Sequence, residues 1–321
     1  METYHDRENS PSCARAVSLA YVVFQVTDLA PMADFMADFG LQPVESLAAD
    51  TLLLRGTGDN PVIHISRLGR DNRFLGLGLN VASAGDLHFL ARQPGASAIE
   101  PNPLPGGGQQ VRLRTPDGVE ITALYGVQPA APVAVRDSHL FNNASEKPRV
   151  NASIRARAEI APVIGLGHCV LRVSDCPESA AWFSHTFGMA VSDYISTPEM
   201  RPIGAFMRFD RGETLVDHHA LLINESRKTG LHHCGFEVQD LDAVYVGHEH
   251  LVSKGYRLEC GVGRHLLGSQ IYDYWLDPYG NRVEHYTDGD VVNHHHQVTH
   301  FTGSGEDTTQ WGMKVPASFF S

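Results

Sequence analysis

The sequence has few cysteines, no long apolar run and no excess of positive charge, and each absence narrows the possibilities. Five cysteines among 321 residues are an odd number without framework spacing, which is typical of a reducing compartment. No apolar run approaches the roughly 20 residues that span a bilayer, and the first residues contain no signal-peptide core. The net charge of −12 argues against nucleic acid and anionic membranes as partners. We therefore expect a cytoplasmic protein.

The composition and the order of the predicted elements indicate two domains with a repeated internal plan. Hydrophobic residues make up 42% and charged residues 19%, as in globular proteins, and 321 residues can hold two cores. The order strand, helix, then further strands occurs four times, although one strand of each cycle in the first half cannot be placed. The predicted helices cover residues 29–39, 85–93, 178–187 and 241–254. We interpret each cycle as a βαβββ module, which makes the fold class α+β.

The chain divides at a segment without clear periodicity. Residues 128–160 are rich in Pro, Ala, Asn and Arg, and we interpret them as a linker. The predicted organisation is an N-terminal pair of modules over 16–127, the linker, a C-terminal pair over 161–290 and a polar, aromatic tail over 291–321.

Two stretches of the second half repeat each other. Residues 165–175 (GLGHCVLRVSD) and 230–240 (GLHHCGFEVQD) agree at six of eleven positions with an offset of 65 residues. Each is a predicted strand with a histidine near its start, His168 in one and His233 in the other. A single histidine on a strand is usually a core residue, but two at repeated positions favour a shared role.

A glutamate in a later strand completes the pattern. Glu284 lies between Val283 and Tyr286 in an apolar run, where an ionised carboxylate needs a partner. One interpretation is an exposed strand face that pairs with an arginine; the other is a metal ligand. The offset of 65 residues carries Glu284 onto His219, so four residues would converge around a pseudo-twofold axis. Two imidazoles and one carboxylate on one face of a metal form the facial triad of non-haem Fe(II) enzymes.

The matching positions in the first half lack such donors. Aligning the two halves places Tyr21, Gly76 and Thr122 where the second half has its histidines and glutamate. None of these side chains builds a mononuclear iron site. The N-terminal pair is therefore predicted to be metal-free and to support the catalytic pair or a subunit interface.

Residues 263–286 (GRHLLGSQIYDYWLDPYGNRVEHY) carry a family signature. The pattern is G-x-H, a short spacer, an apolar residue, Tyr, two residues, Asp or Glu, Pro, x, Gly and then Glu. His265, Tyr274 and Glu284 fall on its functional positions, and Asp273 departs from it where an apolar residue is expected. On these residues the chain resembles the two-domain, type I extradiol ring-cleaving dioxygenases of the vicinal oxygen chelate superfamily, such as catechol 2,3-dioxygenases and trihydroxytoluene oxygenases.

The resemblance implies a fold, a reaction and a set of partners. The fold would be the vicinal oxygen chelate, or glyoxalase-like, arrangement of four modules. The reaction would be Fe(II)-dependent cleavage by O2 of a substituted catechol or trihydroxylated ring, next to the diol, to a semialdehyde or keto acid, in the degradation of aromatic compounds. Mn(II) is an alternative metal, and the assembly would be a homo-oligomer.

The resemblance also implies roles for individual residues. The metal ligands would be His168, His233 and Glu284. Among the catalytic residues, His219 would protonate or hydrogen-bond the oxygen species, and Tyr274 and His265 would contact substrate oxygens; the alternative for each is a structural role. His232 beside His233 is expected to support that ligand. Independently of the resemblance, their positions in the chain lead us to expect apolar pocket walls at Phe206, Met207 and Met200.

Two further questions stay open at this point. The same module serves glyoxalase-type metal-dependent isomerases and non-catalytic binding proteins, so the fold alone does not choose the function. An isomerase would usually have a second carboxylate in place of His219. The histidine run at 294–296 is interpreted as a solvated loop, with closure over the active site as the alternative. The ring substituents, the side of the diol that is cleaved and the choice between Fe and Mn are not readable from the sequence.

Overall fold

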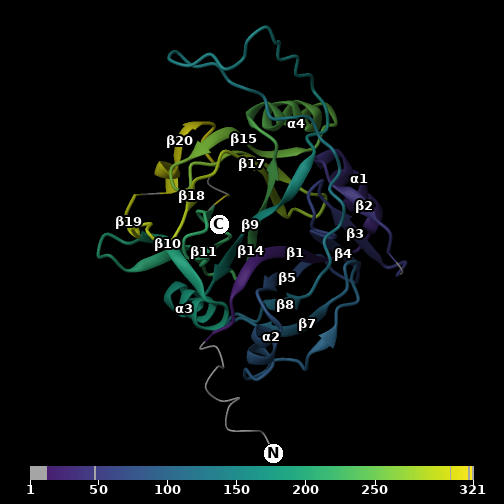
Figure 1. The fold of residues 1–321 in the computed structure, drawn as a ribbon, viewed down its shortest axis with the longest axis vertical. Helices are drawn as coiled ribbons and strands as arrows, with labels where there is room; N and C mark the ends of the chain where they lie inside the picture. Colours follow the sequence, from purple (N-terminus) through teal and green to yellow (C-terminus); the bar gives the residue numbers. More distant parts are fainter. Residues whose placement is uncertain (1–12, 47, 304, 317–318, 320–321) are drawn as a thin grey trace, which may run out of the picture.

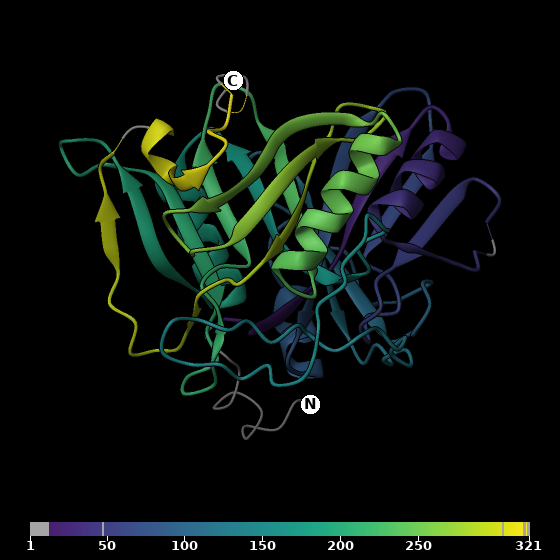
Figure 2. The same cartoon turned by 90° about the horizontal axis from the view of Figure 1, so that it is seen from above.

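The protein, described by a computed structural model for residues 13–46, 48–303, 305–316 and 319, contains two large sheets that lie side by side (Figures 1 and 2). The N-terminal half forms one sheet, coloured purple to blue, and the C-terminal half forms the other, coloured teal to yellow. None of the helices in the described part of the chain is long and apolar enough to cross a membrane.

The first sheet is eight strands wide among the described residues, in the order β2-β3-β4-β1-β5-β8-β7-β6. Its elements are β1 (Ala16–Val26), α1 (Leu29–Phe39), β2 (Gln42–Val44), β3 (Thr51–Arg55), β4 (His64–Leu68), β5 (Arg73–Val81), α2 (Ala84–Leu90), β6 (Glu100–Pro101), β7 (Gln109–Arg114) and β8 (Glu120–Tyr125).

The second sheet is ten strands wide among the described residues, in the order β19-β10-β11-β13-β9-β14-β17-β16-β15-β20. Its modules contain β9 (Val163–Val173), α3 (Cys176–Phe187), β10 (Met189–Ser196), β11 (Pro202–Phe209), β13 (Leu221–Glu225), β14 (Gly230–Val238), α4 (Leu241–Ser253), β15 (Arg257–His265), β16 (Ile271–Leu276) and β17 (Arg282–Thr287). The tail adds β19 (Thr299–Phe301) and β20 (Thr309–Gly312) at the two edges, while β12 (Val216–Asp217) pairs with β18 (Val291–Val292) outside this sheet.

Both sheets have the same internal symmetry. The first strand of each module lies at the sheet centre, where β1 pairs antiparallel with β5 and β9 pairs antiparallel with β14. Each of these strands also pairs in parallel with the last strand of its own module. The strands that the sequence did not place are the short edge strands β2 and β6, which carry little periodicity. The predicted α+β fold of four βαβββ modules is confirmed.

Local sequence signals fix the helix ends. The Asp28 side chain accepts a hydrogen bond from the Ala30 N–H and begins α1, which ends at Gly40 in the left-handed conformation. A Cβ at Gly40 would also overlap the carbonyl of Ala161, so the glycine lets the two halves approach. The predicted bounds of α1 are therefore confirmed.

The two halves share one hydrophobic core and a polar seam. Helix α1 lies beside α4 (Figure 1), and Asp38 of α1 bonds His250 Nε2 at 2.9 Å and the Tyr256 hydroxyl at 2.9 Å. His285 Nε2 donates to the Phe39 carbonyl at 2.7 Å from the centre of the second sheet. The halves are thus fixed relative to each other close to the predicted site.

The segment between the halves, predicted as a linker over 128–160, contains no helix or strand in any of its residues, all of which the structure describes. It runs over α4 (Figure 1) and is tied down by Arg136, which donates two hydrogen bonds of 2.7 Å to Asp240. Burial opposes ionisation of Asp240, but Arg136 and the His139 and Ala243 N–H groups outweigh it and lower the pKa of that carboxyl to about 2.

We expect Asp240→Asn to destabilise the fold by about 1–2 kcal/mol at pH 7, because Asn still caps α4 but loses the charge-assisted pair. The pKa of Asp240 is lower in the folded state, about 2 against 3.8, so its contribution is present above pH 4 and is lost as the pH falls towards 2. Urea unfolding at pH 7 and pH 3 measures both effects.

Asp175, which caps α3 through the Glu178 N–H, is the matched control. Asp175→Asn should change the free energy of unfolding by less than about 0.5 kcal/mol. A deficit in Asp240→Asn that does not shrink at low pH would contradict the assignment.

Candidate metal centre

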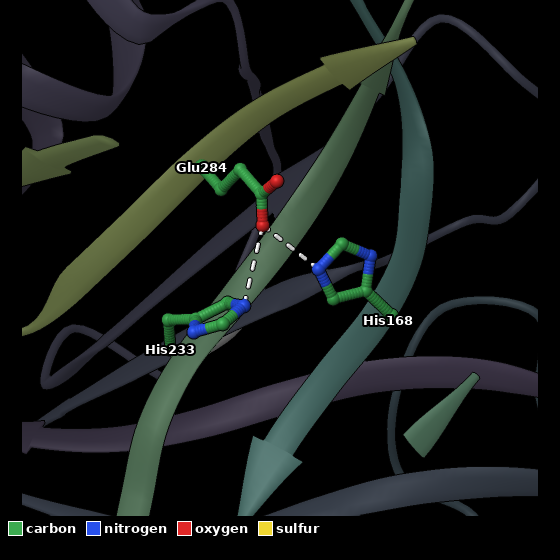
Figure 3. Close-up of side chains that lie close together, drawn as sticks. All are labelled: His168, His233 and Glu284. Atoms are coloured by element: carbon green, nitrogen blue, oxygen red, sulfur yellow. Dashed lines mark hydrogen bonds and ion pairs between the residues drawn. The ribbon is translucent and has the colours of Figure 1, made fainter. Parts of the chain in front are cut away.

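The central strands of the second sheet bring His168, His233 and Glu284 together (Figure 3). Their donor atoms all lie within 4.8 Å of one another. The register explains the convergence, since Gly235 of β14 pairs with His168 of β9 on one side and with Glu284 of β17 on the other. Side chains at paired positions of adjacent strands stand on the same face of a sheet.

The three residues are deeply buried. Glu284 is 0% exposed, and its Oε2 atom lies 2.8 Å from His168 Nε2 and 3.2 Å from His233 Nε2. The second oxygen, Oε1, and the Nδ1 atom of His168 have no hydrogen-bond partner among the described residues. Three converging donors, one of them a buried carboxylate, fit a divalent metal better than an apolar core.

The electrostatics keep the donors in their metal-binding forms. Burial opposes ionisation of Glu284, but His168 and His233 outweigh it and hold the pKa of that carboxyl well below its usual range. Burial lowers the pKa of His233 to about 4, with Glu284 opposing the shift only in part. The carboxylate is therefore anionic and His233 is neutral near pH 7.

A hydrogen-bond chain fixes the tautomer of His233. His232 Nε2 donates to the Phe319 carbonyl at 2.6 Å, which leaves His232 Nδ1 as an acceptor. His233 Nδ1 lies 2.6 Å from that atom and must donate to it. The lone pair of His233 is then on Nε2, the atom that faces Glu284. His232 thus has the supporting position that the sequence predicted for it.

A glycine makes room for the first histidine. A Cβ built on Gly235 would overlap the imidazole ring of His168. The first sheet repeats this relation, because a Cβ on Gly78 would overlap the ring of Tyr21, and Gly78 pairs with Thr122 as Gly235 pairs with Glu284. The register therefore agrees with the alignment of Tyr21, Gly76 and Thr122 to the three candidate ligands.

His219 reaches the site from a position that the repeat did not predict. The offset of 65 residues made His219 the counterpart of Glu284. The same offset makes Val170 the counterpart of Gly235, and Val170 pairs with Leu222 as Gly235 pairs with Glu284. Leu222 is therefore the counterpart of Glu284, and the predicted equivalence is wrong. Leu222 lies 54 residues after His168, whereas Glu284 lies 51 after His233, so the first module is three residues longer between these positions. The connection containing β12, residues 210–220, is longer than its counterpart, residues 277–281. His219 precedes β13 and still lies against His168, with ring centroids 4.9 Å apart.

His265 and Tyr274 lie on the other side of the centre. His265 Nε2 lies 2.7 Å from the Tyr274 hydroxyl and 3.6 Å from Glu284 Oε1. Burial and the nearby carboxylate raise the pKa of Tyr274 well above its usual range, so the phenol stays protonated. Both residues come from adjacent strands, β15 and β16, that pair in the same sheet.

Asp273, which departs from the family signature, has hydrogen-bond partners for its buried carboxylate. It is fully buried, and its Oδ2 atom accepts from Trp275 Nε1 at 2.6 Å and lies 3.0 Å from His248 Nδ1. His248 of α4 thus partners a buried acid. Alternation along β16 turns Asp273 away from the face that carries Tyr274.

A cavity of about 100 Å³ opens beside the three donors. It is lined by the site histidines and Tyr274 together with Val170, Ile195, Phe206, Leu222, Asn224, Leu267, Gln270, Thr308 and Phe319. Phe206 lines it as predicted, but the predictions for Met207 and Met200 are wrong. Met207 faces the opposite, core side of β11, and Met200 is 52% exposed in a turn.

A second polar chain leads away from His219 and was not predicted. His218 Nδ1 lies 3.2 Å from His219 Nδ1, and His218 Nε2 lies 2.8 Å from Asp193 Oδ2. The histidine run approaches this chain: His295 is largely exposed, but His296 faces Asp193. Asp193 lies on a different strand with no repeated motif around it, so no sequence signal joined it to the site.

The second half of the chain is similar to known proteins. Residues 165–285 match the model of the Glyoxalase/Bleomycin resistance protein/Dioxygenase superfamily. Metapyrocatechase 2 of Cupriavidus necator is 30% identical over 155 residues, which are 48% of this chain and 46% of that protein. The match thus spans about half the length of this curated relative.

Solved structures share the fold over nearly the whole chain. The Mn(II)-bound glyoxalase from Novosphingobium aromaticivorans has a TM-score of 0.80 and 23% identity, covering 96% of this chain and 95% of that one. Homoprotocatechuate 2,3-dioxygenase from Arthrobacter globiformis has a TM-score of 0.77 and 20% identity, covering 97% and 93%. The predicted fold is confirmed over nearly the whole chain, and the predicted resemblance to the superfamily is confirmed for residues 165–285.

We expect Gly235→Ala to weaken metal binding at least about tenfold, because the added methyl group displaces the His168 ring from Glu284. Anaerobic titration with Fe(II) or Co(II) measures the affinity. Gly165→Ala on β9 is the control, since its Cβ meets no atom within 4 Å and should leave the affinity unchanged. Equal affinities for the two variants would show that His168 is not a ligand.

Proposed function

We propose that the protein is an Fe(II)-dependent extradiol dioxygenase that cleaves a substituted catechol or trihydroxylated aromatic ring with O2. The observation that carries the proposal is a three-donor centre at the wall of a small cavity that also contains His219, Tyr274 and His265. In this proposal residues 16–127 form a metal-free domain and residues 161–290 the catalytic domain. From the resemblance alone, the proposal includes a homo-oligomer in the cytoplasm.

The proposed ligands fit Fe(II) and leave room for two reactants. Two neutral imidazoles and one carboxylate occupy one face and keep the net charge near +1, which favours an anionic catechol. Fe(II) bound by His168, His233 and Glu284 would hold the diol and O2 side by side and pass electron density between them. The same donors also accept Mn(II).

His219 is placed to exchange a proton with the reactants. Its Nδ1 atom faces His218, so its Nε2 atom is available to the cavity. There it would donate a hydrogen bond or a proton to the oxygen species. This role depends on position beside His168 and not on ligation.

Tyr274 and His265 would orient the substrate from the opposite wall. The Tyr274 phenol is a permanent donor because it stays protonated, and His265 lies within hydrogen-bond distance of it. Together they would hold the diol oxygens in one plane with the metal donors. Both sit on paired strands, which limits their movement.

The cavity favours neutral ring substituents. The described lining residues include histidines but no lysine or arginine, so no permanent positive charge there pairs with a substrate carboxylate. Phe206, Leu222 and Phe319 offer apolar contacts instead. We therefore propose alkyl- or hydroxyl-substituted catechols as the substrate class, in aromatic-compound degradation.

A glyoxalase-type isomerase is the second candidate, because a glyoxalase is among the structures with this fold. The residues argue against it. The described part of the chain offers three donors at this centre, and the additional carboxylate expected for an isomerase is a histidine, His219. A binding protein would not need a buried acid between two imidazoles.

The test is anaerobic loading with Fe(II), followed by oxygen uptake and visible absorbance with methyl-, hydroxyl- and carboxyl-substituted catechols. We expect stoichiometric O2 uptake, a yellow ring-opened product, and a lower kcat/KM for carboxylated rings. Glu284→Gln should fold but lose iron and turnover. No uptake with any diol by iron-loaded protein, with isomerisation of a thiol adduct instead, would establish the second candidate.

We expect His219→Asn to retain iron and a similar KM but to lower kcat by about 10²–10³-fold, because a proton donor and acceptor is removed. Steady-state kinetics and iron analysis on the same sample check this. His185→Asn, on the exposed face of α3, is the control and should match the unaltered protein. An unchanged kcat in His219→Asn would reduce His219 to a structural role.

A further inference from the structure

A second group of two imidazoles and one carboxylate lies outside the candidate centre. Asp193 comes from β10, His218 from the turn before β13, and His296 from the tail between β18 and β19. Asp193 is 6% and His218 is 2% exposed, and His296 is half-buried. One donor atom from each lies within 4.8 Å of the others.

The spacing of this group resembles that of the candidate iron centre. Asp193 Oδ2 lies 2.8 Å from His218 Nε2 and 3.8 Å from His296 Nε2. In the first centre the corresponding distances are 2.8 and 3.2 Å. Ligands about 2.0–2.1 Å from a tetrahedral ion lie roughly 3.3–3.4 Å apart, and the two distances from Asp193 lie on either side of this spacing.

The donors are held in place by bonds that leave the inward atoms available. The other Asp193 oxygen, Oδ1, accepts from the Thr299 N–H at 2.8 Å and from its hydroxyl at 2.6 Å. The backbone of His218 is fixed by Asp290 and Ser192. Such outer bonds orient a carboxylate or imidazole towards an ion.

The Nε2 atom of His296 supplies an independent observation. It is shielded from solvent and has no hydrogen-bond partner among the described residues, although it faces the Asp193 carboxylate. At 3.8 Å the two atoms are too far apart for a hydrogen bond. A buried polar atom of this kind needs an explanation, and an ion between the two side chains provides one.

We infer that Asp193, His218 and His296 form a second metal site, specific for Zn²⁺ or a similar divalent transition metal. Two of the three donors are imidazoles, which disfavours Ca²⁺ and Mg²⁺. The ligands would be Asp193 Oδ2, His218 Nε2 and His296 Nε2, with water as the fourth. This inference goes beyond the proposed function and does not depend on it.

The ion would join three parts of the catalytic half. It would fix the tail segment carrying His296 to the edge of the sheet at β10, where β19 pairs with that strand. It would also require His218 to carry its proton on Nδ1, which donates to His219 Nδ1 at 3.2 Å. Metal binding here would therefore stabilise the tail and orient His219.

Metal analysis of the full chain tests the inference. Protein loaded anaerobically with one equivalent of Fe(II) is incubated with Zn²⁺, dialysed and analysed for both metals. We expect one iron and one zinc per chain in the unaltered protein, and one iron without zinc in His296→Ala. Zinc should raise the Tm of the first and not of the second. His296→Cys should regain zinc, because a thiolate replaces the imidazole as a ligand.

The exposed neighbour provides the control. Glu213, His294 and His295 form another cluster near the surface, and His295→Ala would remove zinc bound there adventitiously while leaving the buried site intact. Retention of zinc in His296→Ala, or absence of zinc from the unaltered protein, would overturn the inference. Glu284→Gln, which disables the first centre, should still bind one zinc, so failure of one site does not imply failure of the other.

Discussion

The buried charge of Glu284 is the constraint on which the second sheet depends. A fully buried, ionised carboxylate is stable only with partners, and the two nearby imidazoles come from the two central strands of the sheet. Strands β9, β14 and β17 must therefore pair in the one register that places His168 and Glu284 on either side of Gly235. A slip of one residue would turn each donor to the other face and leave the carboxylate unpaired.

The first sheet shows that the fold and the metal chemistry are separable. Its central strands have the same register, and Gly78 leaves room for the Tyr21 ring as Gly235 does for His168. Tyr21 and Thr122 stand at the positions that His168 and Glu284 occupy in the other half. In each half, one aromatic or imidazole ring packs over a glycine on this face of the sheet. The side chains at three positions then decide whether the face binds a metal.

Periodicity and capping in the sequence predicted most elements, and α1 was predicted to the residue. His168 and His233 were predictable from the repeat, and Glu284 from the signature that it completes. His219 was wrongly predicted as the counterpart of Glu284 because the first module is three residues longer between these positions. The repeated motif gives no sign of the extra residues. The contact between Asp193 and His296 could not be predicted, because the two residues lie far apart in the chain and meet only through the fold of the tail.

The tail, which follows the last repeat, has more influence on the centre than its position in the chain suggests. Phe319 and Thr308 line the cavity, so the tail forms part of its wall. The Phe319 carbonyl accepts from His232 and so sets the tautomer of His233. On the other side, the tail brings His296 and Thr299 to Asp193, which holds His218 against His219. The repeats place the donors, and the tail fixes the proton positions and the shape of the space around them.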